Sequence, residues 1–166
     1  VDRVDTMEKN CKKYLRVVDY KSGGKTFNLS DVVSGLSTQM LIYLFTIEKN
    51  GKEKYGDIIP SGVLYMPAKA AASDLDRYAS EQDITDKVLK SNRMSGIIVD
   101  DIDIIKGMEH DVNGWFIPVT LTKSGAFDYR SKLIKAEDFV RLKRKIDMIL
   151  KQMALNLHKG EIPVLP

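Results

Sequence analysis

The sequence predicts an α/β domain in which helices flank a mixed β-sheet. Two Val-rich segments at the start of the chain are typical of a strand hairpin, not of a strand–helix–strand unit, and later segments alternate between helical and extended patterns. With 166 residues, of which 43% are hydrophobic and 30% charged, the chain is long enough to bury one core. We therefore expect residues 1–166 to form a single domain.

The first two strands are expected to pair as an antiparallel hairpin. Residues 1–6 and 14–20 are rich in Val, and the polar residues 7–13 between them are typical of a turn. Residues 21–28 include serine and two glycines, which interrupt the extended pattern. The hairpin should therefore lead into a loop.

A helix is expected after this loop. Ser30 and Asp31 carry side-chain oxygens that can cap its first turn, and the helical pattern continues to about Asn50. Its apolar residues recur at steps of three and four, which predicts one buried stripe. The stripe comprises Val32, Leu36, Met40, Tyr43, Leu44 and Ile47.

The middle of the chain predicts two further strands and a helix. Residues 58–66 form an apolar run that a proline ends, and residues 115–122 form another. Residues 81–93 are expected to be helical up to about Gly96, whereas residues 68–78 show no clear period. Trp115 is expected to belong to the core.

Residues 136–159 predict a long amphipathic helix that Gly160 ends. Between residues 139 and 159 only Asp147 is acidic, so its polar face is basic. This face could contact DNA phosphates through Lys143, Arg144 and Lys151, or it could simply be solvated. The inward residues are expected to be Phe139, Leu142, Ile146, Ile149, Met153 and Leu157, and the basic ones Arg141, Lys143, Arg144, Lys145, Lys151 and Lys159.

Composition limits the possible classes of protein without naming one. The net charge of +3 and pI near 8.8 are too mild to identify a nucleic-acid binder. A single cysteine, Cys11, cannot form an internal disulfide or a cysteine-rich metal site, which favours a reduced, cytoplasmic setting. No apolar run reaches the roughly 18 residues of a membrane span. The chain starts at Val1 inside a strand-like pattern, so we expect it to be a fragment of a longer protein.

An acid and a base share one face of the second strand. Side chains alternate along a strand, so Asp19 and Lys21 project together while Tyr20 points away. The pair stands where the strand enters a glycine-containing loop, a position open to substrate. The spacing by itself also fits an ordinary surface ion pair.

A second carboxylate, Asp2, can approach Asp19 from the neighbouring strand. Two converging carboxylates repel each other unless a cation lies between them, and hard oxygen ligands suit Mg²⁺ or Mn²⁺. Such an ion can activate water for phosphodiester hydrolysis, while Lys21 stabilises the charge of the transition state. Asp5 competes with Asp2, but three residues separate them, so only one is expected to face the metal.

Three ordered segments carry a family resemblance. They are residues 1–5 (VDRVD), 19–23 (DYKSG) and 39–43 (QMLIY), and the likeness continues through residues 62–68, 94–101 and 116–119. In this order they resemble the PD-(D/E)XK nucleases, and more narrowly the C-terminal nuclease domain of the B subunit of AddAB-type helicase-nucleases. The resemblance implies a restriction-endonuclease-like α/β fold, with a mixed β-sheet flanked by helices.

The resemblance also implies roles for individual residues. Asp2, Asp19 and the main-chain carbonyl of Tyr20 are implied to bind the metal, with Lys21 as the catalytic lysine. It further assigns Gln39 and Tyr43 to the rim of the active site. Positions four apart share a helix face, which supports this assignment, although Tyr43 as a core residue and Gln39 as its polar neighbour fit equally well.

The implied function is that of a Mg²⁺-dependent DNA exonuclease domain. It would act within a helicase-nuclease that processes double-strand breaks for recombinational repair, with DNA and an A-type subunit as partners and no membrane. The main alternative is a non-catalytic DNA-guiding or scaffolding domain, which the presence of Asp19, Lys21 and Gln39 disfavours. An unrelated α/β binding domain would leave the motif order a coincidence.

Departures from the family pattern concern the ends of the domain. Family members hold an iron–sulphur cluster through one cysteine before the nuclease motifs and three after them. Cys11 matches none of these positions and is expected to be an ordinary turn cysteine or a partly buried one. A helix that usually precedes Asp2 is also missing. The resemblance therefore leaves open whether this chain alone binds metal and cleaves DNA.

Overall fold

The computed structural model describes residues 1–23, 26–68 and 79–161. Within these residues the chain forms a five-stranded sheet in the order β1-β2-β3-β4-β5. The β2/β3 and β4/β5 pairs are parallel, and the β1/β2 and β3/β4 pairs are antiparallel, which confirms the predicted mixed sheet. The strands are β1 (Arg3–Lys9), β2 (Lys12–Lys21), β3 (Ile58–Pro67), β4 (Ser95–Val99) and β5 (Leu133–Ile134).

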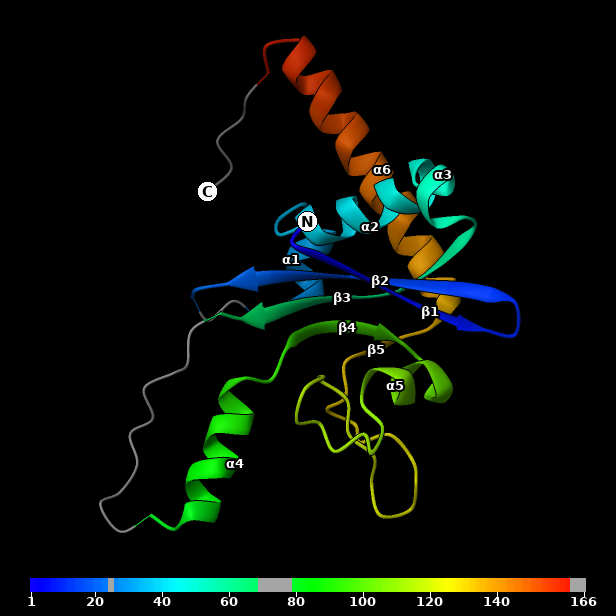
Figure 1. The fold of residues 1–166 in the computed structure, drawn as a ribbon. Coiled ribbons are helices and arrows are strands. Elements are labelled where there is room, and N and C mark those ends of the chain that lie inside the picture. Colours follow the sequence, from blue (N-terminus) through cyan, green and yellow to red (C-terminus); the bar gives the residue numbers. More distant parts are fainter. Residues whose placement is uncertain (24–25, 69–78, 162–166) are drawn as a thin grey trace.

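Helices cover both faces of the sheet (Figure 1). One face packs against α1, α2 and α6, and the other against α5 and the segment 109–132 that follows it. Alternation along the strands explains the two layers, since Val17 belongs to the first core cluster and its neighbour Val18 to the second. The helices are α1 (Leu29–Val33), α2 (Gln39–Asn50), α3 (Lys52–Tyr55), α4 (Glu81–Ser91), α5 (Ile102–Met108) and α6 (Ala136–His158).

The predicted hairpin is confirmed, but its turn is much shorter than residues 7–13. The strands continue to Lys9 and resume at Lys12, so only Asn10 and Cys11 form the turn. Both have positive φ, 51° and 58°. Two-residue turns of this kind match the right-handed twist of the strands, which lets the polar residues around them pair as strands. Cys11 is an exposed turn residue, as expected.

The single helix expected up to Asn50 is wrong, because the chain breaks it into α1 and α2. Gly35 and Ser37 have positive φ between the two helices, 86° and 53°, which a continuous helix does not allow. Leu36, expected in the stripe, is 64% exposed. A Cβ on Gly35 would stand 3.3 Å from side-chain atoms of Ile149 and Met153, so the break also lets α6 approach closely.

The second half of the chain holds the other differences from expectation. The strand predicted at residues 115–122 is wrong, since this segment forms bends and an isolated bridge. Trp115 is 48% exposed, so its expected place in the core is also wrong. The short strand β4 and the helix α5 are elements that the sequence patterns do not predict; Asp101 caps α5 by accepting from Asp103 N–H at 3.0 Å. Residues 69–78 of the stretch without a clear period lie outside the described residues.

The long last helix is confirmed, and Gly160 ends it with φ 72°. Its predicted inward face is buried only in the first half, at Phe139, Leu142 and Ile146. Met153 and Leu157 are 46% and 65% exposed, because α6 extends beyond the sheet (Figure 1). No described helix is long and apolar enough to cross a bilayer.

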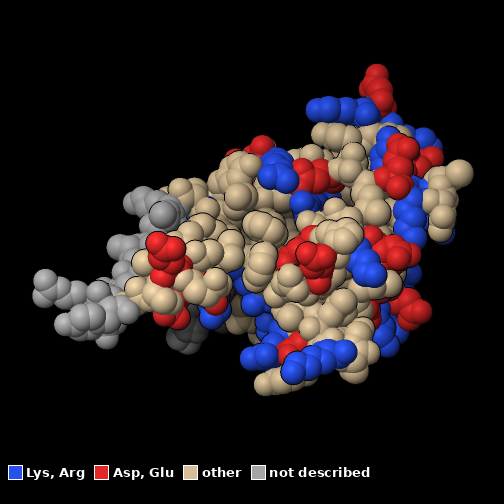
Figure 2. Space-filling model, turned by 60° about the horizontal axis from the view of Figure 1, so that its bottom comes forward, with Lys and Arg blue, Asp and Glu red and all other residues tan. Residues whose placement is uncertain are grey.

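On the side that carries α5 and segment 109–132, charges of both signs are interspersed with uncharged side chains (Figure 2). The surface charge on that side is therefore mixed in sign, which agrees with the mild net charge of +3.

Glu109 replaces the missing strand pairing of segment 115–117. The residue is 7% exposed, and its carboxylate accepts the backbone N–H groups of Trp115, Phe116 and Ile117 at 2.9, 3.2 and 3.1 Å. A buried N–H that loses its partner retains its full desolvation cost.

We expect Glu109→Ala to lower the free energy of unfolding by about 3 kcal/mol, because the buried N–H of Ile117 and the part-buried N–H groups of Trp115 and Phe116 all lose their acceptor. Chemical denaturation followed by circular dichroism measures the change. Glu8→Ala, at an exposed carboxylate paired with Lys13, is the control and should change stability by less than about 0.5 kcal/mol. Equal losses in the two variants would show that Glu109 does not hold the segment.

Candidate active site

The pair Asp19 and Lys21 lies at the end of β2, on the face covered by α2. Asp19 continues the row of Leu15 and Val17, both fully buried, and is itself only 6% exposed. The Lys21 ammonium forms an ion pair with Asp19 Oδ2, and its side chain is 29% exposed. A carboxylate buried to this extent needs a charged or hydrogen-bonding partner. The pair is therefore not an ordinary surface ion pair.

Tyr65 forms the wall beside this pair. It stands opposite Asp19 in the parallel register of β2 and β3 and is 2% exposed. Lys21 Nζ lies 5.8 Å from the centroid of its ring, within cation–π range. Burial raises the pKa of Tyr65, and the Lys21 charge partly offsets this rise. Tyr65 thus bounds the space that the ammonium can occupy.

Lys21 is held in its charged form. The hydrogen bond to Asp19 raises the pKa of Lys21, and the charges of Asp19, Tyr65 and Asp2 add to this against partial desolvation. Because the pKa rises above an already basic value, the side chain is an ammonium throughout the neutral range. A permanent cation at the end of β2 suits the stabilisation of negative charge on a substrate.

Asp2 lies beside the same pair. Its Oδ2 accepts the backbone N–H of Tyr20 at 2.8 Å, which continues the hairpin beyond the last strand pair, Arg3 with Val18. One further step of this register brings Asp2 opposite Asp19, where directly opposed residues share a face. The hairpin therefore brings together the two carboxylates and the Tyr20 backbone that the sequence singled out.

Asp5, the alternative ligand, lies on the other face of the sheet. It stands opposite Arg16 and accepts from Arg16 Nε at 2.8 Å and from Arg3 Nε at 2.7 Å. Burial raises the pKa of Asp5, but the bonds from the two arginines outweigh it and bring the pKa below its ordinary value. Asp5 is thus engaged in an ion-pair cluster on the α5 side.

We expect Asp5→Asn to lower the free energy of unfolding by about 1–3 kcal/mol at neutral pH, because Arg16 is only 12% exposed and loses its anion. A carboxylate whose pKa is lowered in the folded state stabilises the fold at pH values above its unfolded pKa, which is roughly 3.9. This stabilisation is lost as the pH falls through the pKa of the folded state. Denaturant unfolding at pH 7 and pH 2 should therefore show a difference between variant and wild type that shrinks in acid. Loss of Mn²⁺ affinity in this variant would make Asp5 the ligand in place of Asp2.

Gln39 and Tyr43 lie together on the first turns of α2. Gln39 Nε2 donates to Tyr43 Oη at 2.8 Å, so the two side chains act as one unit. Gln39 is exposed, whereas Tyr43 is half-buried and packs against the core cluster that contains Tyr65. The helix covers the face from which Asp19 projects. This placement is compatible with both interpretations of the pair, as active-site rim or as core residue and neighbour.

The basic residues of α6 differ in their surroundings. Lys143 donates to Glu48 Oε2 of α2 at 2.9 Å, and Arg141 pairs with Asp138 at 3.0 Å, so acidic partners exist outside the stretch 139–159. Arg144 and Lys151 are exposed, and neither pairs with an acidic side chain in the part of the chain that the structure describes. Of the predicted contacts, these two are therefore the best placed to meet a phosphate.

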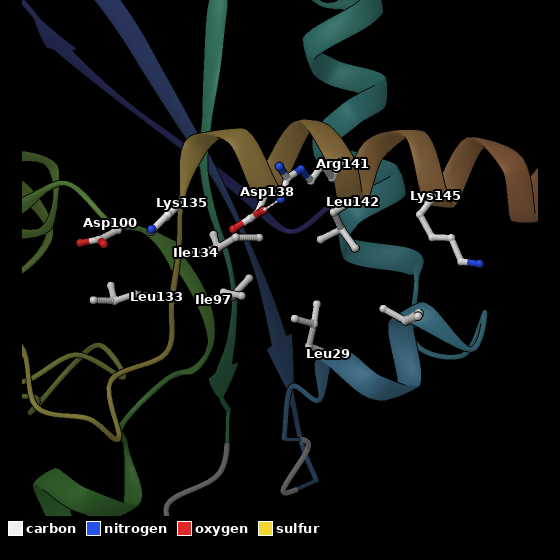
Figure 3. Close-up of a pocket in the computed structure, with 11 residues that line it drawn as sticks. Leu29, Ile97, Asp100, Leu133, Ile134, Lys135, Asp138, Arg141, Leu142 and Lys145 are labelled. Atoms are coloured by element: carbon white, nitrogen blue, oxygen red, sulfur yellow. Dashed lines mark hydrogen bonds and ion pairs between the residues drawn. The ribbon is translucent and has the colours of Figure 1, made fainter.

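A cavity of about 530 Å³ lies apart from the acid–base pair, between α1, β5 and α6 (Figure 3). Its walls are largely apolar, and two of its charged residues, Asp138 and Arg141, pair with each other. Neither Asp19 nor Lys21 lines it. The cavity is therefore a separate feature and not the candidate active site.

The donor set at the end of β2 fits a divalent ion. No described group of three His, Cys, Asp or Glu side chains is arranged to hold a metal. Two carboxylates and one carbonyl, from Asp2, Asp19 and Tyr20, instead offer few and hard ligands. Mg²⁺ commonly binds through one or two carboxylates and keeps several waters, so such a sparse set suits it.

The whole chain, residues 1–166, matches the family model of the PD-(D/E)XK nuclease superfamily, and the chain belongs to this superfamily. The mixed sheet with helices on both faces agrees with the restriction-endonuclease-like fold of these nucleases, which typically use divalent metals.

More particularly, the chain is similar to proteins named as the B subunit of ATP-dependent helicase/deoxyribonuclease. The identity is 33% over 168 residues to the protein of Thermoanaerobacter pseudethanolicus, 33% over 172 residues to that of Clostridioides difficile, and 34% over 169 residues to that of Clostridium novyi. All of this chain is covered in each case, but it spans only 15% of each relative. The resemblance seen in the motifs is thereby confirmed.

Sequence reasoning misses Tyr65 as part of the site. The strand around it is predicted, but its place opposite Asp19 depends on the parallel pairing of β2 with β3. Parallel strands require a crossover connection, and here α1, α2 and α3 supply it. The helical pattern that follows directly on Lys21 predicts such a crossover, and a parallel pairing of the two strands would have placed Tyr65 beside Asp19.

Proposed function

We propose that the chain is a nuclease domain that hydrolyses DNA phosphodiester bonds with the help of Mg²⁺, which Mn²⁺ can replace in experiments. The observation that carries the proposal is the buried Asp19 carboxylate paired with the Lys21 ammonium at the open end of β2. Burial of such a pair costs desolvation energy, and the end of a strand can be stable without a buried ion pair. Membership of the PD-(D/E)XK superfamily supports the same chemistry.

The residues of the site have different roles in this reaction. Asp2, Asp19 and the Tyr20 carbonyl would hold the cation. When bound, the ion polarises a phosphodiester oxygen and makes a bound water more acidic. Lys21, charged at neutral pH, donates to the phosphate oxygen on which charge develops. Tyr65 excludes water from one side of the ammonium and so keeps that interaction strong.

We further propose that this domain acts as an exonuclease within a cytoplasmic helicase-nuclease complex that processes double-strand breaks. The relatives are named as B subunits of an ATP-dependent helicase/deoxyribonuclease, which supports DNA as substrate and an A-type subunit as partner. A non-catalytic guiding domain would bind DNA in the same complex without needing the Asp19–Lys21 pair.

The test is cleavage of end-labelled linear DNA, single-stranded and duplex, with Mg²⁺, Mn²⁺ or EDTA. We expect shortening from the ends with either metal, none in EDTA, and resistance of circular single strands. Because the relatives are much longer, the same assay is run on a chimera in which this chain replaces the matching segment of the Clostridium novyi protein. Metal-independent binding without cleavage in both forms would favour the guiding domain.

Reversing charge on the outer face of α6 should weaken DNA binding for all sequences alike. Phosphate contacts carry no base information, and each one contributes about 0.7–0.9 to the slope of log affinity against log salt. Arg144→Glu with Lys151→Glu should therefore flatten the slope by roughly 1.5. The control is Lys52→Glu with Lys54→Glu on α3. An unchanged slope in the α6 variant would show that its basic face is only solvated.

A further inference from the structure

Two adjacent aromatic side chains, Trp115 and Phe116, project into solvent from the segment between α5 and β5. They are 48% and 52% exposed, although the segment around them is firmly packed. Ile117 and Val119, which follow directly, are fully buried in the second core cluster. The exposure of the two rings is therefore not the result of a segment lying away from the core.

The backbone under these rings is fixed before any ligand arrives. The Glu109 carboxylate accepts the N–H groups of Trp115, Phe116 and Ile117, and Arg93 Nε donates to Ile117 O at 3.1 Å. A side chain presented by an ordered backbone loses less conformational entropy on binding than one on a loose loop. The buried Glu109 carboxylate fixes the backbone that carries two exposed rings, and this arrangement points to a binding surface.

This aromatic pair lies at the same end of the sheet as the candidate active site. Phe116 O accepts from Met94 N at 2.8 Å, and Ser95, the next residue, pairs with Tyr65. Tyr65 in turn pairs with Asp19. Two strand spacings, roughly 10 Å, separate β2 from β4. The segment that carries the rings packs on the opposite face from the acid–base pair, so a ligand in contact with both has to pass around this end of the sheet.

We propose that Trp115 and Phe116 form a stacking platform for the bases of single-stranded DNA whose backbone reaches Asp19 and Lys21; this proposal rests on the nuclease function proposed above. In a duplex the bases are already stacked on one another, whereas unpaired bases have faces that aromatic rings can cover. Over the described residues in this view, Lys and Arg side chains lie among Asp and Glu side chains, so phosphates meet charges of both signs (Figure 2). Stacking is the interaction that this surface offers, and it tolerates any sequence.

Trp115 is the only tryptophan of the chain, so its fluorescence reports on the platform alone. The full chain is titrated in EDTA with an oligothymidylate and with a blunt hairpin duplex of equal length. We expect saturable quenching by the single strand and little change with the duplex. In anisotropy titrations with a labelled oligothymidylate, Trp115→Ala and Phe116→Ala should each weaken binding by roughly 5- to 150-fold.

Tyr129→Ala is the matched control, since this ring is 91% exposed and lies against Arg130 in a separate turn. It should bind as the wild type does. The platform variants should also keep the salt slope of the wild type, because stacking releases no counterions, whereas the Arg144 and Lys151 reversals should flatten it. Circular dichroism melts check that each variant is folded.

The outcomes separate this proposal from the nuclease function. Quenching and weakened variants in EDTA support the platform even if the wild type cleaves nothing with Mg²⁺ or Mn²⁺, a result that would overturn only the nuclease proposal. Conversely, cleavage that persists while Trp115→Ala and Phe116→Ala bind single strands like the wild type overturns the platform. Equal quenching by the hairpin duplex also overturns it.

Discussion

Lys21→Ala should reduce the rate of DNA cleavage by about a hundred- to a thousandfold, with much smaller loss of DNA affinity. Removal of one preorganised hydrogen-bond donor to a developing oxyanion typically lowers the rate of catalysis by this amount. Lys21 is one of 26 lysines and arginines for binding, yet in the described residues it is the cation that pairs with Asp19. Single-turnover cleavage and anisotropy, measured on the same protein with saturating Mg²⁺, separate the two effects.

Lys12→Ala provides the matched control for this variant. Lys12 lies at the other end of the same strand, is exposed, and should leave both rate and affinity unchanged. The Lys21 variant leaves Asp19 buried without its partner, so its melting temperature is compared with and without metal. Cleavage at the wild-type rate would refute the catalytic role. An equal loss of binding and cleavage would make Lys21 a phosphate-positioning residue of a guiding domain.

The acid–base pair could be predicted because its geometry is local. Alternation along one strand places Asp19 and Lys21 on a common face, and an adjacent hairpin strand is the nearest possible source of a second carboxylate. The burial of Asp19 could not be predicted in this way. It depends on α2 and on Tyr65 of β3, whose positions follow from the crossover between parallel strands.

Two of the errors arise where a tertiary contact overrides a local pattern. The break between α1 and α2 goes with the close approach of Gly35 to α6, a contact that no periodicity in residues 30–50 reports. Segment 115–122 has the apolar composition of a strand, but the Glu109 carboxylate takes three of its N–H groups. Trp115 is consequently turned to the surface, where composition alone would bury it.

Asp19→Asn should weaken divalent-ion binding at this site, with Mn²⁺ affinity reduced by about two orders of magnitude or more. Loss of an outer-sphere partner alone typically costs 10- to 100-fold, and here an anionic ligand is removed. The fold should survive, because asparagine has nearly the same shape and retains a carbonyl oxygen toward Lys21. Calorimetric titration with Mn²⁺ measures the affinity. Asp57→Asn, the same exchange at an exposed residue before β3, is the control.

A second readout of Asp19→Asn does not involve metal. Asp19 is the largest cause of the raised pKa of Lys21, so this pKa should fall toward its ordinary value in the variant. A lysine with a raised folded pKa stabilises the fold fully below its unfolded pKa, and this contribution disappears as pH rises through the folded pKa. NMR titration of the lysine side chains in metal-free protein, with Lys21→Ala to assign the signal, measures the shift. Unchanged Mn²⁺ affinity together with a lowered Lys21 pKa would leave Asp19 as the partner of Lys21 but exclude it as a metal ligand.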